Sequence, residues 1–158
     1  MDYARRLGGW DEAVRGNETL KQAAALEAGG NLEEALGLYR SLYAAYPRRV
    51  DVLFRLQALL SQMGKHEEVV PLLKTRLKKV PRDLTVLLRL GDALFALGRQ
   101  GEAFEYWDRI PEGAAHSEPY TQAANRYKKN NLYARASAIY QKGREGLGDS
   151  HLFARELA

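Results

Sequence analysis

Histidines and paired carboxylates are the residues of this chain whose types could do chemistry. A helical metal site needs two histidines four residues apart, with a further ligand nearby. The three histidines, His66, His116 and His151, have no such spacing, and no glutamate stands beside two of them. We therefore predict no metal site and no cofactor, and we interpret the histidines as surface or turn residues.

Two glutamate pairs, Glu33-Glu34 and Glu67-Glu68, are the next candidates, because paired carboxylates can act as general acid and base. The pairs lie 34 residues apart, and each follows a glycine at the expected start of a helix. Carboxylates at this position stabilise the helix dipole, so a structural role explains them better. The chain also has no cysteine, nucleophile elbow or phosphate-binding glycine loop, and we predict a protein without catalytic residues.

Composition places the chain among globular proteins. Of its 158 residues, 46% are hydrophobic and 28% charged, with a formal net charge of +4. No apolar run approaches the ~20 residues of a membrane-spanning helix. The first ten residues lack the apolar core of a signal peptide. Since a chain can begin after a cleaved signal, both cytoplasm and periplasm remain open as compartments.

The elements that position these residues form a repeat. The blocks Gly30–Ala35, Gly64–Val69 and Gly98–Ala103 each begin with glycine, have glutamate in fifth place and start 34 residues apart. A fourth block, Asn131–Ala136, follows after 33 residues. In every unit an apolar stripe of helical period precedes the block and a second stripe follows it. The pattern predicts stacked helix pairs, since one pair cannot bury both of its faces.

These residues resemble the tetratricopeptide repeat (TPR) family. The resemblance rests on a Leu-Gly pair in the first helix, a glycine turn, and small, aromatic and proline positions in the second helix. The matching residues are Leu90, Gly91, Gly98, Ala103, Trp107, Gly30, Ala35, Tyr39 and Pro47. It implies an all-α, right-handed superhelical solenoid of about four helix-turn-helix units over residues 16–150. The predicted units are 16–49, 50–83, 84–116 and 117–150.

Several local features follow from this organisation. Asn31, three residues before Glu34, and Ser117, two residues before Pro119, are typical helix caps. Pro111 comes early in its unit, so we expect an irregular loop over residues 111–117. Gln57 and Arg76 replace small residues of the family pattern, which predicts looser packing in the repeat formed by residues 50–83. Pro47 and Pro81 are expected to end second helices.

The two ends of the chain do not complete a unit. Residues 1–15 predict a short N-terminal capping helix anchored by Trp10. Residues 151–158 are either a C-terminal capping helix or the first helix of a further unit in a longer protein. Their apolar residues Leu152, Phe153 and Leu157 do not make a polar cap.

In the TPR family the first helices line a concave groove, and three rows of residues recur there at the repeat step. One row is basic (Lys21, Arg55, Arg89), and the row before it is apolar (Leu20, Phe54, Leu88). The third row contains Ala24, Ala58, Asp92 and Asn125. Such a groove suits an extended or helical segment with acidic groups. The alternative is that these side chains only cover the helices. The predicted partner contacts are Lys21, Phe54, Arg55, Leu88, Arg89, Asp92, Phe95, Asn125 and Lys128.

The sequence therefore predicts a non-catalytic scaffold that binds a protein or peptide segment. A structural spacer, or a segment of a larger envelope protein that self-assembles through exposed end helices, is the alternative. RNA binding is disfavoured, because the basic run from Lys74 to Arg82 contains no aromatic residue for base stacking. We interpret this run as a solvated face.

Overall fold

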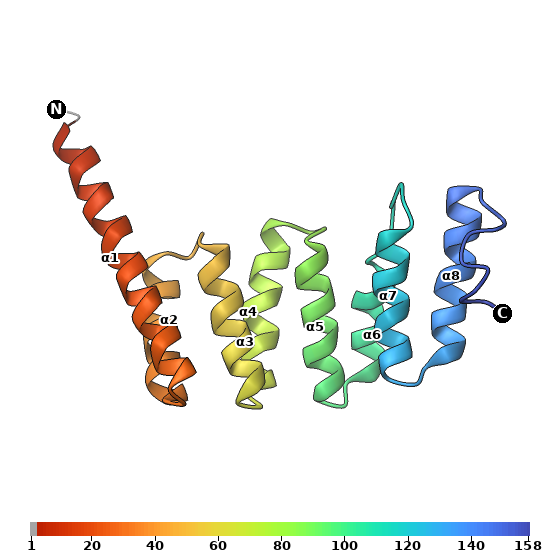
Figure 1. Ribbon diagram of the computed structural model, residues 1–158, viewed down its shortest axis with the longest axis horizontal. Helices are drawn as coiled ribbons and strands as arrows, with labels where there is room; N and C mark the ends of the chain where they lie inside the picture. Colours follow the sequence, from red (N-terminus) through yellow and green to blue (C-terminus); the bar gives the residue numbers. More distant parts are fainter. Residues whose placement is uncertain (1–2) are drawn as a thin grey trace. The chain divides into compact units, whose positions relative to one another are not determined.

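The protein is an array of α-helices (Figure 1). The computed structural model describes the backbone of residues 3–158 and the side chains of residues 14–158. Within this part of the chain there are eight helices and no strand, which confirms the predicted all-α class. The helices are α1 (Tyr3–Ala28), α2 (Leu32–Ala45), α3 (Val50–Gln62), α4 (His66–Lys79), α5 (Leu84–Ala96), α6 (Gln100–Asp108), α7 (Glu118–Lys129) and α8 (Tyr133–Leu147).

The repeated glycine owes its place to backbone conformation. Gly30, Gly64 and Gly98 have φ of +85°, +73° and +74°, in the left-handed region that glycine adopts without strain. The fourth block has Asn131 there, with φ +61°, and asparagine tolerates this region better than most residues. After each such residue the next N–H bonds back to a carbonyl five residues earlier, as Asn31 N does to Leu26 O at 2.9 Å. This bond ends the first helix of every pair.

The chain divides into two compact units. The first, Met1–Lys65, contains α1 to α3, and the second, His66–Ala158, contains α4 to α8. The boundary falls between α3 and α4, inside the predicted helix pair 50–83. Each unit has buried apolar side chains of its own.

In the first unit α2 packs against both α1 and α3. Its buried side chains include Ala35, Leu36 and Tyr39, and the facing side of α3 buries Val52 and Leu56. Tyr46, the residue after α2, lies close to Gly16 of α1, where an added Cβ would lie 3.1 Å from the tyrosine ring. The tight approach explains a glycine within this long helix.

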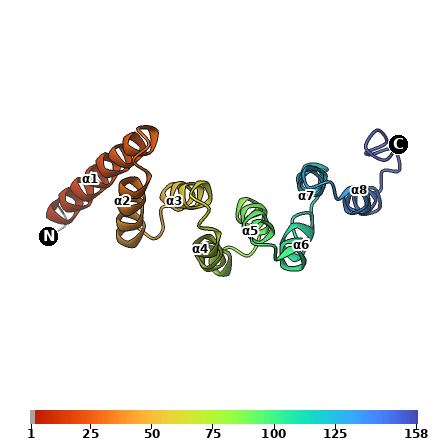
Figure 2. The same ribbon diagram turned by 90° about the horizontal axis from the view of Figure 1, so that it is seen from below.

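In the second unit α5 and α7 lie on one side and α4 and α6 on the other (Figure 2). Trp107 of α6 is fully buried at the centre of the core. Its ring stacks on Phe95 at 5.4 Å and meets Tyr127 edge-on at 5.4 Å. Arg135 of α8 covers the neighbouring Phe104 ring at 4.1 Å, a cation–π contact. These aromatic contacts connect four helices of the unit.

Two predicted helix caps are wrong. Asn31 precedes α2 with φ −80° and ψ 63°, and its side chain makes no capping bond, since the preceding turn fixes this geometry. Ser117 precedes α7 with helical angles, φ −72° and ψ −24°, so its hydroxyl is not placed as a cap. Asp83, which was not predicted as a cap, begins α5 by accepting a 3.2 Å bond from the Val86 N–H.

The predicted irregular loop is confirmed. α6 ends at Asp108 and α7 begins at Glu118, and turns fill the residues between them. Gln57 and Arg76, which replace small residues of the family pattern, both have hydrogen-bond or ion-pair partners. The Gln57 amide donates to Ser61 Oγ at 2.9 Å, and Arg76 Nε lies 3.2 Å from Asp83 Oδ2.

The two ends differ from the predicted helices. Residues 3–15 are the first part of α1 and not a separate helix. The anchor role predicted for Trp10 lies outside the described side chains. Residues 151–156 form turns in place of a helix. Within them Phe153 is buried, and its ring lies 4.7 Å from that of Tyr140 in α8.

Candidate functional site

Three predicted contact residues lie in the first unit. Lys21 on α1 and Arg55 on α3 are exposed, and Phe54 is half-buried. Between their helices the buried Tyr39 hydroxyl of α2 donates to Glu27 Oε2 at 2.8 Å. Burial and this carboxylate raise the pKa of Tyr39 to about 12, although the Arg55 charge opposes the shift. Arg55 thus lies near an internal polar link of the unit.

The second unit has a more developed charge cluster, centred on Asp92 of α5. The Asp92 carboxylate lies 3.0 Å from Arg126 Nε of α7. Burial raises the pKa of Asp92, while the positive charges of Arg126, Lys129 and Arg89 act in the opposite direction. Burial lowers the pKa of Arg89, and the nearby Arg126 charge adds to this effect. Three cations therefore surround one carboxylate.

Asp92 also lines a pocket of about 210 Å³ on the side of α5 and α7. Lys129 and Asn130 form the α7 wall, and Phe95 forms part of the α5 wall. The buried Trp107 ring contributes from below, and its indole N–H donates to Leu88 O at 3.3 Å. The pocket thus has aromatic lining residues together with one acidic and one basic residue, and the charges of Arg126 and Arg89 also act on Asp92.

The structure gathers only part of the predicted set at this pocket. Asp92 and Phe95 line it, and Arg89 lies within range of the Asp92 charge. Asn125 and Lys128 are exposed on α7 but are not among its lining residues. Leu88 is half-buried and contributes its carbonyl to Trp107.

Three residues of this site were not predicted from the sequence: Arg126, Lys129 and Asn130. Arg126 and Lys129 lie three positions apart, so they share one face of a helix. This spacing, together with the acidic Asp92 in the first helix of the preceding repeat, was the sequence signal that could have indicated the cluster. Their pairing with Asp92 depends on how α7 packs on α5, which the repeat step alone does not specify.

Phe95 has a structural role beside any contact role. Its equivalents in the other repeats, Glu27, Ser61 and Lys128, are polar, so the repeat pattern alone does not require an aromatic ring here. The ring instead stacks on Trp107 and lies 6.4 Å from Phe104, so part of it belongs to the core. Its half-buried surface still lines the pocket.

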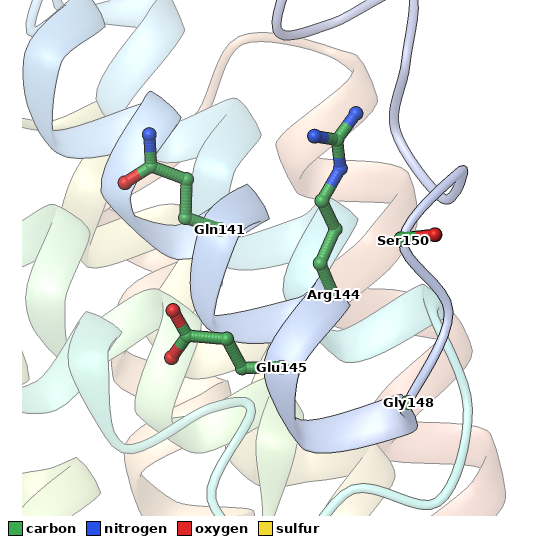
Figure 3. A pocket seen from close by; sticks show the side chains of 5 residues that line it. All are labelled: Gln141, Arg144, Glu145, Gly148 and Ser150. Atoms are coloured by element: carbon green, nitrogen blue, oxygen red, sulfur yellow. The ribbon is translucent and has the colours of Figure 1, made fainter.

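A pocket of about 470 Å³ at the end of α8 is a weaker candidate (Figure 3). It is lined by Gln141, Arg144, Glu145, Gly148 and Ser150. Figure 3 shows Gln141 and Glu145 pointing to one side and the Ser150 hydroxyl to the other. Arg144 Nε donates to Leu152 O at 2.6 Å and so holds the C-terminal turns. The polar groups do not converge on a ligand.

The described residues offer neither a metal cluster nor a membrane-spanning helix. Among them, no three or more histidine, aspartate or glutamate side chains are grouped so that they could hold a metal ion. No helix in the part of the chain that the structure describes has the length and apolarity to cross a membrane.

Comparisons with known proteins identify the fold. No family profile matches the chain, and no curated protein matches it in sequence. A TPR protein from Thermus thermophilus superposes with a TM-score of 0.58 at 19% identity, covering 82% of this chain and 73% of the other. The chain has a TPR fold. A TPR protein from Parabacteroides merdae agrees, with a TM-score of 0.62 at 18% identity over 85% of this chain and 54% of that one.

MamA from Desulfovibrio magneticus is a further structural neighbour of this TPR array. It superposes with a TM-score of 0.61 at 15% identity, covering 85% of this chain and 76% of MamA. At these identities the likeness extends to the fold alone.

Proposed function

We propose that this TPR chain is a non-catalytic scaffold that belongs to the TPR family and binds a segment of another protein. In the second unit the segment lies on the side formed by α5 and α7, over the Asp92 pocket. In the first unit Lys21, Phe54 and Arg55 contribute contacts from α1 and α3. The TPR fold supports this proposal because helical repeat arrays present extended binding surfaces.

The pocket at Asp92 is the observation on which the proposal rests. Arg89, Arg126 and Lys129 all act on the single Asp92 carboxylate, so these four residues comprise three cations and one carboxylate. Aromatic rings lie directly beside these charges. The combination favours a segment with an acidic side chain next to an apolar one, because the carboxylate pairs with the cations while the apolar group contacts Phe95.

The test compares two Lys-Lys pairs that end helices. Lys128→Glu with Lys129→Glu reverses the charge at the end of α7, beside the pocket. Lys78→Glu with Lys79→Glu makes the same change at the end of α4. Wild type and both variants are used to capture partners from lysate of the source organism, and bound proteins are quantified by mass spectrometry.

We expect a partner that wild type and the α4 variant retain and that the α7 variant loses at least tenfold. Circular dichroism and melting temperature establish that both variants are folded. Equal capture by all three proteins contradicts the proposed site. Loss by the α4 variant alone also contradicts it and places the partner on the other side of the unit.

A further inference from the structure

The basic run of α4, which we interpreted from the sequence as a solvated face, lines a second pocket in the second unit. This pocket, of about 300 Å³, is lined by residues of α4, of α6 and of the turn after α6. Figure 2 shows α4 and α6 on the same side of the unit. Lys74, Leu77 and Lys78 come from α4, and Tyr106 comes from α6. Arg109, just after α6, completes it. Three cations from two segments thus surround one hollow.

No acidic side chain lines this pocket, and two acids of the neighbouring segments, Glu102 and Asp83, have partners elsewhere. Glu102 is the acid whose charge interacts with Lys74, but Arg99 Nε and Nη2 hold its carboxylate at 2.7 and 2.8 Å. Asp83 is paired with Arg76 and caps α5. Among the described residues, no ion pair involves Lys74 or Lys78. Their ammonium groups are therefore available to an external anion.

Arg109 is already held in place at the pocket. Its Nη2 donates to Pro81 O at 3.3 Å, and its guanidinium lies 5.7 Å from the centre of the Tyr106 ring. These contacts reduce the side-chain entropy that binding would otherwise cost. Because a guanidinium has five N–H donors, others remain for a ligand.

The aromatic ring that the sequence lacked between Lys74 and Arg82 comes from the neighbouring second helix. Tyr106 is half-buried, and with Leu77 it gives the pocket an apolar and aromatic wall. A sequence window could not show this, since Tyr106 lies 28 residues beyond Lys78.

We propose that this pocket binds a phosphate monoester, with Lys74, Lys78 and Arg109 as the phosphate ligands. Leu77 and Tyr106 contact the group that bears the phosphate. A phosphate monoester has a charge near −2 at neutral pH, which suits three cations better than a single carboxylate does. Lysine and arginine are the side chains that recognise phosphate. The volume is at the lower end for ligand pockets, so it suits one small group.

The experiment titrates the full chain with phenyl phosphate, inorganic phosphate and benzoate, followed by calorimetry and amide NMR shifts. We expect saturable binding of one phenyl phosphate, at least fivefold tighter than inorganic phosphate and at least tenfold tighter than benzoate. Shifted amides should lie in α4 and α6. Equal affinity for benzoate would overturn the preference for phosphate. Equal affinity for inorganic phosphate would overturn the role of Tyr106 and Leu77.

Neighbouring lysines provide a matched control. Lys78→Gln removes a charge that lines the pocket, and Lys79→Gln removes the same charge one residue away, outside the lining. Both side chains are exposed, so both variants should fold. We expect at least fivefold weaker phenyl phosphate binding for Lys78→Gln and no change for Lys79→Gln. Equal weakening by both, or binding only of a long polyanion such as polyuridylate RNA, would overturn the site and indicate a diffuse basic surface.

Discussion

At the scale of single residues, the contact of Gly91 with Trp107 is the tightest constraint in the second unit. Glycine inside a helix costs ~1 kcal/mol relative to alanine. Here a Cβ would overlap the indole ring, whose Cε2 would lie 2.9 Å away. Trp107 is fully buried and bonded to Leu88 O, so it cannot move aside without loss. The glycine is therefore required for close helix packing.

We predict that Gly91→Ala lowers the free energy of unfolding by about 1–3 kcal/mol, because overpacking outweighs the gain in helix propensity. Gly37→Ala in α2 is the matched control, since no heavy atom lies within 4 Å of its added Cβ. It should raise stability by ~0.5–1 kcal/mol. Urea denaturation measures both, and stabilisation of similar size by the two variants would contradict the contact.

At the scale of helices, the repeat pattern does not show which helices begin with a side-chain cap. α5 has such a cap and α2 does not. Asp83 precedes α5 with extended angles, φ −72° and ψ 97°, so its side chain reaches the first turn. It also links to Arg76 of α4. Asn31 has the more typical sequence context but not the geometry. One side chain thus fixes both the start of α5 and its contact with the preceding helix.

Asp83→Ala should reduce the free energy of unfolding by about 1–2 kcal/mol, since it removes a capping bond and an ion pair. Asn31→Ala should change it by less than ~0.5 kcal/mol. Thermal or urea unfolding compares the two variants. A larger loss for Asn31→Ala would show that the caps are assigned to the wrong residues.

The helices were largely predictable because their ends follow local rules. The left-handed turn at Gly30, Gly64 and Gly98 repeats in sequence, and Pro111 marks where α6 is cut short. The caps were not predictable, because a helix cap depends on two backbone angles that residue type alone does not fix. The C-terminal turns were also missed, since Phe153 folds back onto Tyr140 through contacts that no periodic pattern encodes.

At the scale of the whole molecule, the candidate site shows where a repeat pattern stops being informative. The 34-residue step led us to predict Asp92 and Phe95 as partner contacts, and both line the pocket. It did not find Arg126 or Lys129, because the fourth repeat, residues 117–150, is shifted by one residue and packs through its own side chains. Charge pairing between neighbouring first helices is a tertiary property.

Helical repeats contact mainly their neighbours, so local damage should stay local. We predict that Phe153→Ala increases hydrogen exchange in α8 and the C-terminal turns, because Phe153 covers Tyr140 and Gly143. Exchange in α1 to α3 should be unchanged. Mass spectrometry of peptic fragments gives both readouts in one experiment. Uniformly faster exchange along the chain would indicate a single cooperative fold instead.

The position of Trp107 has an optical consequence. The sequence contains two tryptophans, so Trp10→Phe leaves one indole as the sole chromophore of its kind. That indole is fully buried, forms the floor of the Asp92 pocket and is stacked on Phe95. A segment that settles over Phe95 would alter the surroundings of this ring, and with them its emission wavelength and near-ultraviolet dichroism. In the Trp10→Phe variant, Trp107 is therefore a fluorescent reporter of the proposed binding face.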